Sequence, residues 1–211
     1  MDPKLIITVL FLISATVIAA QEYVRPPPRK ALHFPWSRKP SSLPQQADLS
    51  KVDRQKTPWL LVLFHVPWYN SNKAHQGEGD SMMAAMEPLL YAASADIVFA
   101  GHVHAYERTK RVNNGKSDTC GAVHITIGDG GNKEGLAHKY KNPPPEWSVF
   151  REASFGHGEL NIVNSTHAFW TWHRNDDDEP VRSDQVWITS LVSSGCVAEK
   201  TLELTKILTE P

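Results

Sequence analysis

Cysteine is scarce in this sequence, and neither sign of charge dominates it. Two cysteines among 211 residues are too few for the framework of bridges that holds small disulfide-rich proteins together. The 22 Lys and Arg residues nearly match the 23 Asp and Glu residues, and they are interspersed along the chain. A chain without a basic face lacks the electrostatic footprint of a nucleic-acid-binding protein. We therefore expect no nucleic-acid partner.

The longest apolar run lies at the N-terminus, where residues 1–20 read as a secretory signal peptide. Lys4 precedes an apolar stretch from Leu5 to Ile18, and Ala19-Ala20 supply small residues for a cleavage site. A bilayer-spanning helix needs about twenty apolar residues, so this shorter, interrupted stretch favours cleavage over anchoring. We expect a secreted protein, in the extracellular space, the cell wall or the vacuole, without membrane association after cleavage. An uncleaved signal anchor is the alternative.

Two features gain meaning in a secretory compartment. Asn164 opens the sequon Asn164-Ser165-Thr166, an acceptor for N-glycosylation because its middle residue is not proline. An unmodified turn is the alternative. Cys120 and Cys196 would be able to form a disulfide there, but their spacing alone leaves the pairing open.

The middle of the chain predicts one strand–helix–strand crossover. The apolar run 59–64 indicates a buried strand, and a second apolar run occupies 96–100. Between them, Gly79-Asp80-Ser81 can begin a helix, which Pro88 should kink or divide. Apolar residues recur in this helix at helical spacing and are expected to pack in the core: Met82, Met83, Met86, Leu89 and Leu90. Such a crossover implies parallel neighbouring strands.

The sequence after residue 120 is typical of β-structure. Strands are predicted over 122–127, 157–163, 166–173 and 181–189, with a glycine-rich turn over 128–132. The acidic run 176–179 is read as the solvated tip of a hairpin, with a calcium site as the alternative.

Three histidines stand at the ends of predicted strands. His65 follows the run 59–64, and Gly101-His102-Val103-His104 follows the run 96–100. In an extended segment, side chains at i and i+2 share a face, so His102 and His104 are expected to converge. Ligand sites in open α/β sheets lie beyond the carboxyl ends of the strands, so the three imidazoles are expected to meet at one rim. Imidazoles bind transition metals, which activate water for hydrolysis; a hydrogen-bonded core histidine is the alternative for each one alone.

From Trp59 to about Leu191, the chain resembles the C-terminal part of the catalytic domain of plant purple acid phosphatases, which are dinuclear metallophosphoesterases. Four segments carry the resemblance, and they occur in the order of the family: Phe64-His65-Val66-Pro67-Trp68-Tyr69-Asn70, Gly101-His102-Val103-His104-Ala105-Tyr106-Glu107-Arg108, Ile127-Gly128-Asp129-Gly130-Gly131-Asn132 and Phe150-Arg151-Glu152-Ala153-Ser154-Phe155-Gly156-His157. Four ordered matches make the resemblance specific.

The resemblance implies an acid phosphatase that hydrolyses phosphomonoesters with a metal-bound hydroxide at a dinuclear Fe(III)–M(II) site. It assigns His65, in the motif Val-x-x-His, and His102 to the divalent metal, zinc or manganese. It assigns His104 to ferric iron. His75 corresponds to a family histidine that contacts the substrate phosphate and can protonate the leaving alkoxide; a solvated loop residue is the alternative.

The chain also departs from the family. Three metal motifs that precede Val-x-x-His in the family, Gly-Asp-x-Gly, Gly-Asp-x-x-Tyr and Gly-Asn-His, are missing upstream of Val62. Residues 22–46 resemble the start of the family's N-terminal β domain, and the sequence then passes directly into the late catalytic domain. Asp80 or Asp129 would have to substitute for the missing carboxylates, although we assign Gly128-Asp129-Gly130-Gly131 to a turn.

Two functions therefore stay open at this point. The first is the phosphatase activity. The alternative is a catalytically inactive, secreted pseudo-phosphatase fragment that binds a single zinc ion or no metal, forms a homodimer, or pairs with a full-length homologue.

The predicted fold class is α/β, with α+β character at the C-terminus: an incomplete metallophosphoesterase β-sandwich flanked by helices, with a C-terminal β-rich segment. Five segments follow from the sequence: a signal peptide at 1–20, a remnant of the N-terminal β domain or linker at 21–47, a partial metallophosphoesterase domain at 48–119, a C-terminal purple acid phosphatase segment at 120–190, and a tail at 191–211.

Overall fold

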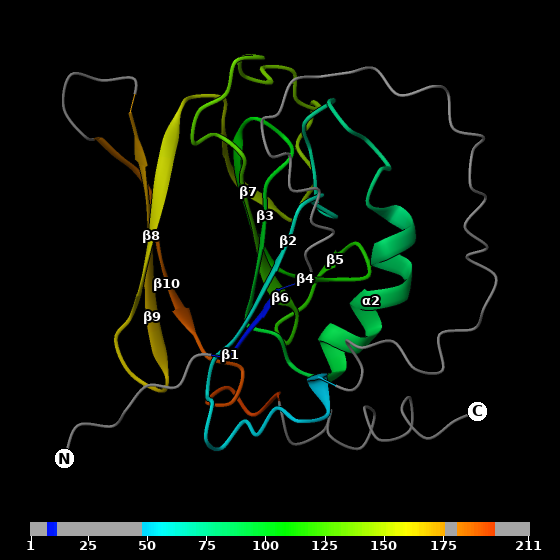
Figure 1. Cartoon of the computed structure of the whole chain (residues 1–211), viewed down its shortest axis with the longest axis vertical. Helices are drawn as coiled ribbons and strands as arrows, with labels where there is room; N and C mark the ends of the chain where they lie inside the picture. The colour runs from blue at the N-terminus through cyan, green and yellow to red at the C-terminus, as the bar shows by residue number, and fades with distance from the viewer. Residues whose placement is uncertain (1–7, 12–47, 176–180, 197–211) are drawn as a thin grey trace, which may run out of the picture.

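A computed structural model of the chain describes residues 8–11, 48–175 and 181–196 (Figure 1). The described elements follow one another as β1 (Thr8–Phe11), β2 (Leu60–Phe64), α2 (Asp80–Ala92), β3 (Ile97–Ala100), β4 (Tyr106–Asn113), β5 (Lys116–Ser117), β6 (Ala122–Ile127), β7 (Ser148–Glu152), β8 (Gly156–Ile162), β9 (His167–Arg174) and β10 (Val181–Thr189). They form three layers: a three-stranded sheet, a seven-stranded sheet and helix α2 (Figure 1). The predicted α/β sandwich is confirmed.

The seven-stranded sheet has the order β1-β2-β3-β6-β4-β5, and β7 also pairs with β4. Strands β2, β3 and β6 run parallel, as the predicted crossover requires. The buried Asp96 fixes the start of β3, because its carboxylate accepts hydrogen bonds from the Leu60 amide at 2.8 Å and the Arg54 guanidinium at 2.6 Å. Since β6 pairs with both β3 and β4, this sheet continues across the predicted segment boundary at 119/120.

Helix α2 covers one face of that sheet (Figure 1). Met86, Leu89 and Leu90 are buried against β2 and β3, which confirms that the apolar stripe belongs to the core. The prediction that Pro88 could divide the helix is wrong: α2 continues through it as one helix. Pro88 removes one backbone N–H, and the buried leucines that follow it hold the last turn against the sheet.

The other face of the seven-stranded sheet packs on the antiparallel sheet β8-β9-β10. Trp170 and Trp172 of β9 fill the space between the sheets, and Trp172 stacks on Tyr106 with 4.5 Å between the ring centroids. Glycine makes room for the large rings, since a Cβ on Gly158 would lie 1.9 Å from Trp170. All three strands were predicted to within one residue at each end. The predicted acidic tip 176–179 lies outside the described residues.

Strands β4, β5 and β7 were not predicted from the sequence. The strand β4 carries the charged residues Glu107, Arg108, Lys110 and Arg111, which do not alternate with apolar residues as a half-buried strand normally does. Glu107 and Arg108 are nevertheless buried, because each of them has polar partners from distant parts of the chain.

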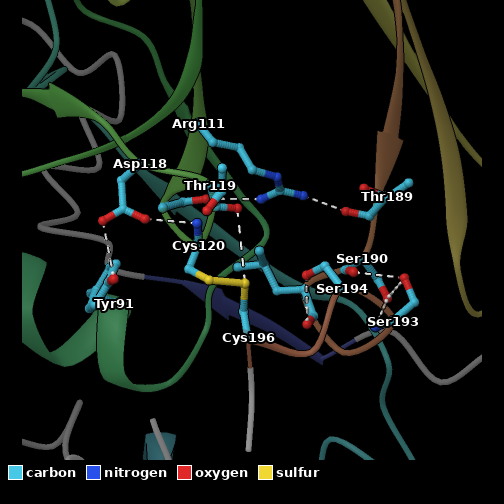
Figure 2. Close-up of a disulfide and its surroundings, with 12 residues drawn as sticks. Tyr91, Arg111, Asp118, Thr119, Cys120, Thr189, Ser190, Ser193, Ser194 and Cys196 are labelled. Atoms are coloured by element: carbon cyan, nitrogen blue, oxygen red, sulfur yellow. Dashed lines mark hydrogen bonds between the residues drawn. A yellow bond between two sulfur atoms is a disulfide. The ribbon is translucent and has the colours of Figure 1, made fainter. Parts of the chain in front are cut away.

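A disulfide joins Cys120, just before β6, to Cys196, which follows β10 (Figure 2). The spacing of the two cysteines had left this pairing open. Arg111 also links the same two segments, because its guanidinium donates to the Gly121 carbonyl at 2.9 Å and to the Thr189 carbonyl. Beside the bridge, the Cys120 amide donates to Asp118 at 2.7 Å. The disulfide therefore joins two segments that lie 76 residues apart in the sequence.

The strand β1 pairs in parallel with β2, and it comes from the apolar stretch predicted as a signal peptide. The rest of that stretch, the predicted remnant at 21–47 and the tail beyond residue 196 lie outside the described residues. Across the described ranges, no helix has both the length and the apolar character needed to cross a membrane.

Candidate metal centre

The structure brings together two of the three histidines of the predicted rim, His65 and His102. His65 directly follows β2, and the segment 101–105 directly follows β3, so both lie beyond the carboxyl ends of parallel strands. The Gly101 amide donates to the His65 carbonyl at 3.0 Å, which ties the two loops together.

The segment that carries His102 and His104 is not an extended strand, contrary to our expectation. The Val103 amide donates to the Gly101 carbonyl at 2.7 Å and the Ala105 amide to the Val103 carbonyl at 2.8 Å, so the chain folds into two successive tight turns. His102 adopts φ 62°, in the left-handed region. A turned backbone removes the i, i+2 alternation, and the two imidazoles accordingly have different partners.

The His102 imidazole lies at the centre of the rim. Its Nδ1 is 3.0 Å from Nε2 of His65, and its Nε2 is 2.7 Å from a carboxylate oxygen of Glu78. The ring centroid of His75 lies 4.0 Å from that of His102. Both nitrogens of His102 therefore face a partner, on opposite edges of the ring.

His75 and Glu78 come from the loop between β2 and α2. Two asparagines shape this loop, because the Asn72 amide donates to the Asn70 side chain at 2.8 Å and the Ala74 amide donates to the Asn72 side chain at 2.9 Å. At the end of the loop, His75 Nδ1 lies 3.0 Å from the second carboxylate oxygen of Glu78.

Glu78 was not identified from the sequence. An exposed glutamate in a polar loop gives no periodic signal, and the resemblance assigned no role to it. The spacing His75-x-x-Glu78 is the feature that could have revealed it, because it places an imidazole and a carboxylate at one bend of a loop beside the predicted rim.

The charges of neighbouring groups act on two residues of the rim, His65 and Glu78. Burial lowers the pKa of His65, and the nearby charges of His102, His104 and His75 lower it further. Hydrogen bonds from His75 and His102 lower the pKa of the Glu78 carboxyl. The rim therefore favours an ionised Glu78 carboxylate and a neutral His65 imidazole.

His104 turns away from this cluster. Its Nδ1 lies 3.1 Å from the Gly135 carbonyl oxygen and 3.9 Å from the Glu134 carboxylate, both on the loop after β6. The structure thus brings His65, His75 and His102 together and gives His104 partners of its own.

Neither aspartate considered as a substitute ligand reaches the cluster. Asp129 is fully buried, and its carboxylate accepts a hydrogen bond from the indole N–H of Trp172 at 2.7 Å. Burial raises the pKa of Asp129 to about 6. Asp80 is exposed at the start of α2, where it faces Gly77.

The glycine-rich segment after β6 packs against the backbone of the loop that carries His102. A Cβ on Gly128 would lie 2.1 Å from the Val103 carbonyl oxygen, so only glycine permits the two backbones to approach this closely. Residues 128–132 lie between strands, as predicted, and the chain bends at Gly130.

A polar cavity of about 300 Å³ opens beside His75. Lys141 contributes a cation to its wall, and aromatic side chains of Trp68, Tyr69 and Trp147 form part of the remainder. The cavity is large enough for a small phosphorylated molecule next to His75, and Asp80 adds a carboxyl group to its wall.

The donor set fits one metal ion. Among the described residues, a single group of three potential ligands lies within 4.8 Å of one another, namely His75, Glu78 and His102. Two imidazoles and a carboxylate are ligands typical of a catalytic zinc site. Within the described part of the chain, this group holds one carboxylate, that of Glu78.

Two known families match the chain. The calcineurin-like phosphoesterase family matches residues 9–106, and the family described as iron/zinc purple acid phosphatase-like protein C matches residues 121–183. Together these matches imply a metal-dependent protein, since the second description names iron and zinc.

Curated relatives and solved structures point the same way. Purple acid phosphatase 18 of Arabidopsis thaliana is 79% identical over 166 residues, which are 79% of this chain and 38% of the relative. Purple acid phosphatase 22 of the same plant is 60% identical over 152 residues, 72% of this chain and 35% of the relative. A solved structure of a purple acid phosphatase from yellow lupin seeds, PPD1, superposes with a TM-score of 0.58 at 27% identity. The match covers 69% of this chain and 27% of the lupin chain.

The chain spans less than two-fifths of the length of these two Arabidopsis relatives. Within that span, the sequence motifs, the sheet order and the two family matches agree. The chain belongs to the purple acid phosphatase family of metallophosphoesterases.

Proposed function

We propose that the chain hydrolyses phosphomonoesters at the histidine rim with the help of a bound metal. One observation carries the proposal: His65, His75 and His102, which the sequence separates by up to 37 residues, converge in a member of a phosphatase family, and His75 also lines a polar cavity. Zinc and manganese are the divalent candidates, with iron as the family's second metal.

A divalent ion at the rim would lower the pKa of a bound water to roughly 7 and so supply the nucleophile. The chain's own residues would position the substrate. Lys141 offers a positive charge in the cavity wall, and imidazole N–H groups at the rim can donate hydrogen bonds to phosphate oxygens. The aromatic side chains of the cavity would then receive the organic part of the ester.

The test is hydrolysis of p-nitrophenyl phosphate by the full chain after loading with zinc, manganese or iron plus zinc. We expect metal-dependent hydrolysis that falls at least tenfold in His102→Ala. The matched control is His167→Ala, which removes an exposed histidine at the start of β9. Equal rates for His102→Ala and the unmodified chain would refute the proposal. A chain that binds metal but hydrolyses no phosphoester would be the inactive metal-binding relative instead.

We further propose that the protein is a secreted glycoprotein. The Cys120–Cys196 disulfide supports an oxidising compartment. Asn164 supports glycosylation, because it is exposed in the turn between β8 and β9. The intact mass of the protein from its native source, before and after enzymatic deglycosylation, tests both parts; an unchanged mass that still includes residues 1–20 would contradict them.

A further inference from the structure

We propose that the N-linked glycan on Asn164 packs over an exposed apolar patch on the outer face of the three-stranded sheet. The patch consists of Val163, Phe169 and Trp187. This proposal rests on the proposed glycosylation of Asn164, and it adds the surface that the glycan contacts. The first sugars of such a glycan are N-acetylglucosamine, whose rings present C–H groups on their faces and hydroxyl groups at their edges.

The outer face of the three-stranded sheet is open. The sheet β8-β9-β10 is the outermost layer on the side away from α2, and no helix or strand of the described residues covers it (Figure 1). Ala168, Trp170 and Ile188 point inward and are buried, so the alternate residues of the same strands point outward. Two of the outward residues are large and apolar, namely Trp187, which is 59% exposed, and Val163, which is 50% exposed.

The strand register gathers these outward side chains into one patch. Trp187 of β10 lies opposite Phe169 of β9, with 4.8 Å between the ring centroids. Val163 joins them through the neighbouring row, because its amide donates to the His167 carbonyl at 3.0 Å, two residues before Phe169. Apolar side chains that gather at the surface mark an interaction site, whereas scattered ones are normal.

The chemistry of the patch suits a sugar. Asn161 of β8 lies opposite Phe169 on the side away from Trp187, so a polar amide borders the two aromatic rings. The apolar face of a sugar ring can stack on an aromatic ring, while its hydroxyl groups can exchange hydrogen bonds with an exposed amide. A partner that is apolar throughout would leave this amide without a hydrogen-bond partner.

The sequon lies at the end of this patch, since Asn164 directly follows Val163 in the turn between β8 and β9. The side-chain oxygen of Asn164 accepts hydrogen bonds from the amide and the hydroxyl of Thr166 and from the His167 amide, each at 2.8 Å. Among the described residues, its amide nitrogen donates no hydrogen bond, and this nitrogen is the atom that receives the sugar. The Trp59 indole donates to the Asn164 carbonyl at 2.8 Å, which ties the turn to the core. The attachment point is therefore fixed beside the patch.

The glycan can reach the patch from this point. Phe169 lies two residues beyond His167 on β9, a distance of about 7 Å along an extended strand, so the first sugars span it. In the attachment step, the Asn164 amide nitrogen attacks the anomeric carbon of a lipid-linked oligosaccharide pyrophosphate. The C–N bond forms as the C–O bond breaks, the pyrophosphate leaves, and the nitrogen loses one proton. The packing itself needs no further covalent change.

Oxidative footprinting read by mass spectrometry tests the proposal, because it reports the exposure of each tryptophan separately. The secreted full chain is compared before and after an amidase removes the whole glycan; the carboxyl group left at Asn164 keeps the oxygen that the turn requires. We expect the glycan to lower the oxidation of Trp187 roughly twofold or more, because a sugar covers one of the two faces of the indole. Trp147, which lines the cavity beside His75, is the internal control and should not change.

Thermal unfolding supplies a second measurement. The glycan should raise the Tm of the unmodified chain by about 2–4 °C. Trp187→Thr should remove most of this difference, since threonine suits an exposed strand position but offers no ring to the sugar. The matched control is Val149→Thr, which replaces an apolar residue of β7 that is 48% exposed in the other sheet and should keep the difference.

The outcomes separate this proposal from the proposed glycosylation. An intact mass without a glycan on Asn164 would contradict both. A glycan on Asn164 that leaves the oxidation of Trp187 unchanged, or that stabilises Trp187→Thr as much as the unmodified chain, would overturn the packing alone. Protection of Trp187 that survives removal of the glycan and increases with protein concentration would assign the patch to a second copy of the chain, and would also overturn the proposal.

Discussion

Arg108 and Asp184 form a two-pronged ion pair between the two sheets, although 76 residues separate them in the sequence. The guanidinium Nε and Nη2 donate to the two carboxylate oxygens at 2.7 and 2.8 Å. The hydroxyl of Tyr106 donates to the same carboxylate at 2.7 Å, and the Trp170 indole donates to that hydroxyl at 2.8 Å. This network joins β4 to β9 and β10 through polar groups that are almost fully buried.

Removing the carboxylate should therefore destabilise the chain strongly. In Asp184→Ala, the buried guanidinium loses its partner, so we expect the free energy of unfolding to fall by about 3–5 kcal/mol in urea titrations. The control is Glu146→Ala, which breaks an exposed pair with Lys110 and should cost less than about 1 kcal/mol. Similar losses for the two variants would show that the buried pair does not hold the sheets together.

The glycine turn under the rim gives a second prediction. In Gly128→Ala, the new methyl group would meet the Val103 carbonyl and displace the loop that carries His102. We expect zinc affinity to fall roughly tenfold and the free energy of unfolding to fall by about 1–3 kcal/mol. Gly130→Ala is the control, because a Cβ there would meet nothing within 4 Å. A Gly128→Ala variant that binds zinc normally would mean that the turn does not support the rim.

The disulfide should make a large contribution to stability. It closes a loop whose ends are 76 residues apart, which corresponds to about 4 kcal/mol of lost freedom in the unfolded chain. Unfolding measured with and without dithiothreitol should show this difference. The double variant Cys120→Ser, Cys196→Ser should match the reduced chain and be insensitive to the reductant; an unmodified chain whose stability ignores the reductant would contradict the prediction.

The raised pKa of Asp129 should make the folded chain less stable as the pH rises. Its pKa is raised from 3.8 to about 6, so between these values the folded chain binds more protons than the unfolded chain. The contribution of this group to stability is full below about pH 4 and is lost as the pH rises through 6, by about 3 kcal/mol. Asp129→Asn, which keeps an acceptor for the Trp172 indole, should remove this decrease.

The buried His124 changes the stability in the opposite direction as the pH rises. The free energy of unfolding must therefore be measured as a function of pH for both the unmodified chain and Asp129→Asn. Burial lowers its pKa from 6.5 to about 3, and its contribution to stability is therefore full above pH 6.5 and lost as the pH falls. The difference between Asp129→Asn and the unmodified chain cancels this effect. A difference that stays constant from pH 4 to 7 would show that folding does not change the pKa of Asp129.

The sequence predicted the parts of the fold that depend on periodic patterns. The run 59–64, the stripe containing Met86 and the alternating strands after residue 156 all bury the residues that their spacing selects. Strand β4 was missed because Arg108 and Glu107 look like surface residues until their partners Asp184 and Ser148 come together through the tertiary fold. No local pattern records such partners.

In the site, too, the sequence predicted the features that depend on local patterns and missed those that depend on the tertiary fold. The carboxyl ends of parallel strands placed His65 and His102 correctly at one rim. The orientation of the imidazoles depended instead on the turned backbone at His102, whose φ of 62° is invisible in the sequence. Glu78 was missed because its role arises from a loop that returns to the rim, stabilised by the side chains of Asn70 and Asn72.

The most direct test of the metal site is a crystal of the full chain soaked with zinc, with diffraction recorded at the zinc absorption edge. We predict anomalous density at the histidine rim, about 2.0–2.1 Å from a ring nitrogen of His102. A soaked crystal without an anomalous peak at the rim would contradict this account.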